Sequence, residues 1–76
     1  MKLTINGQEV EIKVKDSNGK YNPEATVFFL NDISLHFNYA ETYLNCQGYQ
    51  ASANRAGKIG HDIFNALNEA GAYNKV

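Results

Sequence analysis

An Asn-Gly dipeptide between two alternating runs is the feature that most limits what this chain can fold into. Around Asn6 and Gly7, apolar residues recur at every second position: Leu3, Ile5, Val10, Ile12 and Val14. Such alternation is typical of half-buried strands, and a type I′ turn needs the positive φ that Asn and Gly tolerate. The first sixteen residues therefore predict a β-hairpin. Its register pairs Leu3 with Val10 and Met1 with Ile12 on one side, and Lys2 with Glu11 on the other.

The segment Asn22-Pro23-Glu24 predicts the start of a helix, after a polar loop over residues 16–21. Asn is a favourable N-cap, Pro suits the first helical position, and an acidic residue suits the first turn. Helical spacing of the apolar residues continues to Gln47, and Gly48 fits a left-handed residue at the helix end. One alternative remains open: residues 25–30 and 33–39 also fit two strands, because short apolar runs are ambiguous.

A second helix is predicted from Tyr49 to Ala70, followed by Gly71 as its end signal. Its apolar stripe consists of Ala56, Ile59, Ile63, Leu67 and Ala70. Gly57 and Gly60 each weaken a helix by about 1 kcal/mol relative to Ala, so we expect the small residues Ala53, Ala56 and Gly60 to allow close helix contact. The expected fold is α+β: an N-terminal β-hairpin followed by an antiparallel two-helix hairpin (ββαα), in a single small domain spanning residues 1–76.

The first helix carries more apolar surface than one hairpin and one helix can cover. At about 100° per residue, its apolar arc spans roughly 220°. One sector holds Phe29, Leu30, Ile33, Phe37, Ala40, Tyr43 and Leu44, and a second adjoining sector holds Phe28, Leu35, Tyr39 and Cys46. Ser34, Glu41 and Thr42 belong to the polar remainder. Either this helix is sandwiched between the hairpin and the second helix, or Phe28, Leu35 and Tyr39 meet a partner protein or another copy, by default in a twofold dimer.

His36 is the first candidate for chemistry, because Asp32 lies four residues before it on the same helical face. A carboxylate can fix the tautomer of an imidazole and shift its pKa, as in an acid-base dyad. No nucleophile lies at helical spacing from the pair, however, and Cys46 is about 15 Å away along the axis. The favoured interpretation is an interface-edge histidine satisfied by Asp32, and no catalytic residue is predicted.

Arg55 and Lys58 on the second helix form a candidate anion site. With Asp32 and His36 they could line a nucleotide pocket between subunits, which defines an alternative function of small-molecule sequestration. Asp62 follows Lys58 by four residues, so the favoured interpretation is a solvated, salt-bridged face. The His and Cys residues lack the short paired spacings of zinc sites, and the glycines form no phosphate-binding motif. We therefore expect no metal and no cofactor.

Composition narrows the functional class. The net charge of -1 argues against binding to nucleic acid, and no apolar run approaches the length of a membrane span. Cys46 is the one cysteine, so no internal disulfide can form, and we expect this small apolar side chain to be buried. The hairpin begins at once, without the pattern of a signal peptide, which predicts a cytoplasmic protein.

The chain has ten Asn and six Lys but one Arg, a bias typical of AT-rich genes. In size and composition it resembles the small accessory proteins of phages and mobile elements, many of which inhibit bacterial defence. The resemblance rests on no motif and assigns no residue. Together with the apolar excess on the first helix, it predicts a non-enzymatic protein that occludes the surface of an unidentified host protein, in the host cytoplasm if it is phage-encoded.

Overall fold

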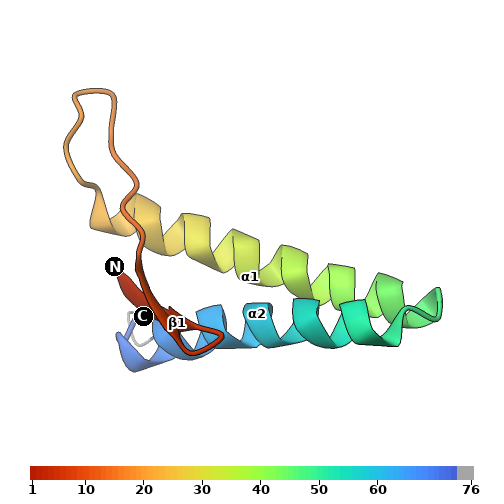
Figure 1. Ribbon diagram of the computed structural model, residues 1–76. Helices are drawn as coiled ribbons and strands as arrows, with labels where there is room; N and C mark the ends of the chain where they lie inside the picture. Colours follow the sequence, from red (N-terminus) through yellow and green to blue (C-terminus); the bar gives the residue numbers. More distant parts are fainter. Residues whose placement is uncertain (74–76) are drawn as a thin grey trace.

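The computed structural model describes residues 1–73 and has the order β1, β2, α1, α2. An antiparallel two-stranded sheet of β1 (Lys2–Ile5) and β2 (Gln8–Glu11) precedes α1 (Pro23–Cys46) and α2 (Gln50–Glu69). The two helices run side by side and are joined by a short turn, and the sheet lies across one end of the pair (Figure 1). The predicted ββαα fold is confirmed, and the alternative of a second hairpin is wrong.

The hairpin has the predicted register and turn. Leu3 pairs with Val10 and Lys2 with Glu11. Asn6 and Gly7 have φ values of 53° and 79°, as a type I′ turn requires. Beyond the strands, Met1 and Ile12 exchange backbone hydrogen bonds, so the predicted pairing of these two residues is confirmed as well.

We expect Asn6→Ala or Gly7→Val to destabilise the protein more than any charge change on the outer side of the hairpin. A Cβ at Gly7 would meet no atom within 4 Å, so the loss is conformational and arises from positive φ. It should amount to about 1–2 kcal/mol. Thermal unfolding of both variants beside Glu9→Gln measures this; unchanged midpoints for both turn variants would contradict the assignment of the turn.

Local signals set the limits of both helices. The Asn22 side chain accepts a hydrogen bond from the Ala25 N–H at 3.0 Å, and Pro23 opens α1. Each helix ends in a Schellman motif with a glycine at positive φ, Gly48 after α1 and Gly71 after α2. The motif at Gly48 reverses the chain within three residues, which places α2 antiparallel to α1.

The core lies where the sheet meets the helix pair. Its fully buried members are Leu3 from β1, Leu30 from α1, and Ile63 and Leu67 from α2. Away from this end, the helices approach through Ala53, Ala56 and Gly60, the small surface predicted from the sequence. The half of the helix pair nearer the turn has no sheet over it (Figure 1).

Three expectations about individual residues are wrong. Ser34, assigned to the polar remainder of α1, is buried, and its hydroxyl donates to the Gly60 carbonyl at 2.9 Å. Cys46 is exposed, because it lies on the same side of α1 as Phe28 and Tyr39, the side that points away from α2. Ala70, the last residue of the α2 stripe, is also exposed, since it caps the helix rather than packing on α1.

Candidate functional site: two exposed surfaces

The side of α1 that points away from α2 is rich in exposed aromatic residues. At about 100° per residue, Phe28, Asp32, Leu35, Tyr39 and Tyr43 fall within one narrow sector, opposite the buried Leu30. We call these five residues the outer face of α1. Phe28 is 68% exposed, Tyr39 70% and Tyr43 64%, and Leu35 is 45% exposed. The three residues predicted to meet a partner therefore lie together and uncovered within the chain.

The hairpin does not sandwich α1. β1 packs against α2, and the hairpin meets α1 in the core cluster, where Leu3 lies with Leu30. A second contact joins the segment that follows β2 to the first turn of α1. The Thr26 hydroxyl accepts a hydrogen bond from the Val14 N–H at 3.0 Å and donates one to the Asn22 carbonyl. Both contacts lie on the inner side of α1, so they leave the outer face exposed; Ala72, after α2, lies beside Phe28 at one end of it.

The four residues of the predicted ligand site do not meet within the chain. Asp32 and His36 are exposed on the side of α1 away from α2. Arg55 and Lys58 are exposed on the side of α2 away from α1, where Arg55 donates to the Ser52 hydroxyl at 3.2 Å and Lys58 pairs with Asp62 at 3.6 Å. α1 and α2 pack against each other through the faces that lie opposite these four residues. A pocket that uses all four therefore requires a second copy of the chain. Among residues 1–73, no group of three His, Cys, Asp or Glu side chains is arranged to hold a metal ion.

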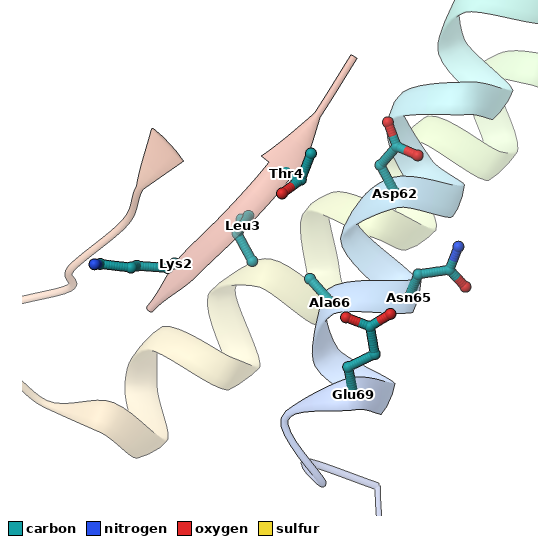
Figure 2. Close-up of a pocket in the computed structure, with 7 residues that line it drawn as sticks. All are labelled: Lys2, Leu3, Thr4, Asp62, Asn65, Ala66 and Glu69. Atoms are coloured by element: carbon teal, nitrogen blue, oxygen red, sulfur yellow. The ribbon is translucent and has the colours of Figure 1, made fainter. Parts of the chain in front are cut away.

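A second surface, which the sequence did not reveal, is a groove between β1 and α2 (Figure 2). Its volume is about 270 Å³, and its lining comes from residues 2–4 of β1 and from Asp62, Asn65, Ala66 and Glu69 of α2. No residue of β2 lines it, so it lies at the free edge of β1. Lys2 points away from α2, toward Glu9 at 3.8 Å, and the carboxylates of Asp62 and Glu69 remain on the helix side.

Asp62 fastens the hairpin turn to α2. Its Oδ2 accepts a hydrogen bond from the Asn6 N–H at 3.0 Å, and Lys58 lies beside it. The hydrogen bond from Asn6 and then the positive charge of Lys58 lower the pKa of the Asp62 carboxyl, against the opposing effect of partial burial. The sequence suggested only the pair with Lys58, because nothing local indicates a contact between residues so far apart in the chain.

Acid should therefore weaken the attachment of the hairpin. A carboxyl whose pKa is depressed by folding contributes stability above its unfolded pKa, near 4, and loses it as the pH falls through the folded value. Asp62→Asn keeps an acceptor for Asn6 but removes the titration. We expect its free energy of unfolding to be lower than that of the wild type at pH 7, by less than about 1 kcal/mol, and to converge with it near pH 2. Urea unfolding between pH 2 and pH 7 measures this; parallel pH curves would contradict it.

No protein-family model, no curated protein and no solved structure matches this chain significantly. The function must therefore be argued from the two surfaces alone. Among residues 1–73, neither helix is both long enough and apolar enough to cross a membrane.

Proposed function

We propose that this protein is a non-enzymatic binding protein that occludes the surface of another protein with the outer face of α1. The observation that carries the proposal is the exposure of Phe28, Tyr39 and Tyr43 along one side of a single helix. Aromatic residues are enriched at the centres of protein interfaces, where they supply large contact area at low conformational cost. A contiguous apolar patch of this kind commonly marks an interaction site.

The size of the patch suits a small interface. With roughly 200 Å² for a fully exposed large side chain, the exposed parts of the apolar outer-face residues amount to about 500 Å². Two such patches facing each other bury about 1,000 Å², the lower limit for a specific interface. A second copy of the chain meets this limit without any further surface, and a larger partner could exceed it by extending past Phe29 and Tyr49, which are also exposed.

Self-association through this face is part of the proposal. The exposed acidic side chains on or beside it, Glu24 and Asp32, both lie toward the start of α1, so in an antiparallel pairing those of one copy do not face those of the other. A twofold axis perpendicular to α1 would run the two helices antiparallel, and this arrangement also makes the interaction of their dipoles favourable. Association would keep the rings of Phe28 and Tyr39 from water until a host protein competes for the same face.

The biological role proposed here is inhibition of a bacterial system by a protein of a phage or mobile element, acting in the host cytoplasm. Small size, the compositional bias and the exposed binding face support it. The competing function is sequestration of a nucleotide between subunits by Asp32, His36, Arg55 and Lys58. It has the weaker support, since two copies would have to bring opposite sides of the helix pair together.

Affinity purification from a bacterial lysate separates these functions. The bait is the wild-type chain, and the matched variant is Tyr39→Ser, which removes one exposed ring without disturbing the core. Mass spectrometry should find a stoichiometric protein with the wild type and much less with Tyr39→Ser. A nucleotide released from the denatured wild-type protein, with no protein partner, would instead support sequestration and contradict the occlusion function.

A further inference from the structure

The free edge of β1 offers backbone groups for an additional strand. Met1 and Ile12 exchange hydrogen bonds. In an antiparallel pair, hydrogen-bonded and non-hydrogen-bonded pairs alternate. The observed register then places Lys2–Glu11 and Thr4–Glu9 among the non-hydrogen-bonded pairs. The N–H and C=O groups of Lys2 and Thr4 therefore point away from β2.

These outward groups face the groove rather than bulk solvent. Asn6 continues the row of Lys2 and Thr4, and its N–H bonds to Asp62 of α2 at 3.0 Å. The N–H of Asn6 is thus already bound by a carboxylate of α2. This contact shows that the outward groups of β1 point toward the side on which α2 lies. Within residues 1–73, no hydrogen bond outside the β1–β2 ladder involves the backbone of Lys2 or Thr4.

We infer that the groove between β1 and α2 binds an extended peptide segment that carries a basic side chain, by addition of a third strand at the free edge of β1. The main chain of the segment would pair with Lys2 and Thr4, as in other cases in which a peptide extends a sheet edge. Ala66, whose side chain is short, lines the helix side of the groove beside residues 2–4. The site shares no residue with the outer face of α1, so it goes beyond the proposed function.

The negative charge on the helix side of the groove favours a segment with a basic side chain. Asp62 and Glu69 lie on the helix side of the groove, whereas the Lys2 ammonium is turned toward Glu9 on the other side of the strand. Asp62 shares its charge with Lys58, and Glu69 is exposed and makes no ion pair with any residue of the described chain. A Lys or Arg side chain beside Glu69 would supply the missing cation. The acidic residues of β2 already have cations beside them, Lys2 for Glu9 and Lys13 for Glu11, and no residue of β2 lines the groove.

A defined probe tests this site on the intact chain. The probe is acetyl-Val-Lys-Val-Lys-Val-amide, with acetyl-Val-Glu-Val-Glu-Val-amide as the charge control, titrated into isotope-labelled protein and followed by nuclear magnetic resonance. The basic peptide should shift the amide signals of Lys2 and Thr4 and slow their hydrogen exchange, with a dissociation constant below about 1 mM. The acidic peptide should bind at least about tenfold more weakly.

Two proline variants isolate the backbone pairing. Thr4→Pro removes the outward donor of β1 without removing a bond of the β1–β2 ladder, and should weaken binding about tenfold. Glu9→Pro removes the equivalent donor from the edge of β2 and is compared with Glu9→Gln, which removes the same charge beside Lys2 but keeps the donor; these two variants should bind the peptide equally. Glu69→Lys should weaken the basic peptide several-fold and abolish the preference over the acidic one.

Any of three results of the peptide titrations would overturn the inference: no shifts at about 1 mM peptide, shifts confined to α1, or equal affinities for Thr4→Pro and the wild type. If Thr4→Pro does not fold, the test is the hydrogen exchange of the Lys2 and Thr4 amides in the wild type: exchange that the basic peptide does not slow would contradict strand addition. Pairing of two copies through β1 would appear as a mass that falls in Thr4→Pro, and it too would overturn the peptide site. Loss of the partner in the Tyr39→Ser experiment has no bearing on these outcomes.

Discussion

Leu35→Glu is expected to convert a self-associated wild-type protein into a monomer. Leu35 lies at the middle of the outer face of α1, and association would bury its side chain against a second copy. Burying an unpaired carboxylate costs several kcal/mol, which is enough to break a micromolar association. The released monomer should also unfold at a lower temperature, because dimer formation no longer stabilises the native state.

Light scattering coupled to size exclusion decides this over a tenfold range of concentration. Asn54→Glu is the matched control, since it adds the same charge at an exposed position of α2, far from the outer face. The wild type and the control should elute with the mass of two or more chains, and Leu35→Glu with the mass of one. A wild type that has the mass of one chain throughout contradicts self-association. If Leu35→Glu remains oligomeric, the interface lies instead at the hairpin edge, where Thr4, Glu9 and Lys13 are the residues to substitute.

Two glycines of α2 should respond in opposite directions to the same substitution. At Gly60, a new Cβ would lie 3.0 Å from Phe37 Cβ and 3.2 Å from the Ser34 carbonyl oxygen, both on α1. Backbone cannot move aside cheaply, so the helices must separate, and overpacking of this kind costs about 1–3 kcal/mol. Ala gains about 1 kcal/mol in helix propensity, which leaves Gly60→Ala less stable than the wild type.

At Gly57, the obstacle is the carboxylate of Glu41, the end of a flexible side chain that can turn toward solvent. Gly57→Ala should therefore keep most of the gain in helix propensity and raise the free energy of unfolding by about 0.5–1 kcal/mol. Urea unfolding of both variants under one set of conditions measures the difference. Equal stabilisation by both would show that the helices are farther apart at Gly60 than the structure has them.

The parts of the fold that the sequence predicted are those encoded locally. Asn6-Gly7 defines the hairpin, Asn22-Pro23 the start of α1, and Gly48 and Gly71 the helix ends, each through its own backbone preference. These signals act within a few residues, so they need no knowledge of the tertiary contacts.

The sequence placed Leu30 on the inner side of α1 and Phe28, Leu35 and Tyr39 on the outer side, but it did not predict that Ser34 is buried, because a hydroxyl side chain was assigned to the polar remainder. The close approach of α1 to Gly60 on α2 explains this burial: a Cβ at Gly60 would lie 3.2 Å from the Ser34 carbonyl oxygen, so only a short side chain fits at this crossing. Ser34 can be buried because its hydroxyl finds the Gly60 carbonyl as acceptor. The groove beside β1 and the contact between Asn6 and Asp62 depend in turn on where the sheet lies on α2, which no local pattern indicates.

The placement of the sheet over one end of the helix pair divides the molecule into unequal cooperative units. Leu3, Leu30, Ile63 and Leu67 hold the sheet end together, whereas in the half nearer the turn the buried apolar residues are the small Ala53 and Ala56. Little apolar area is buried there, so the turn end should open locally at a free energy well below that of global unfolding. Tyr39 and Tyr43 belong to this more labile half. A protein that covers them would therefore rigidify the segment it binds, and part of its binding energy would be spent on ordering the tip of the helical hairpin.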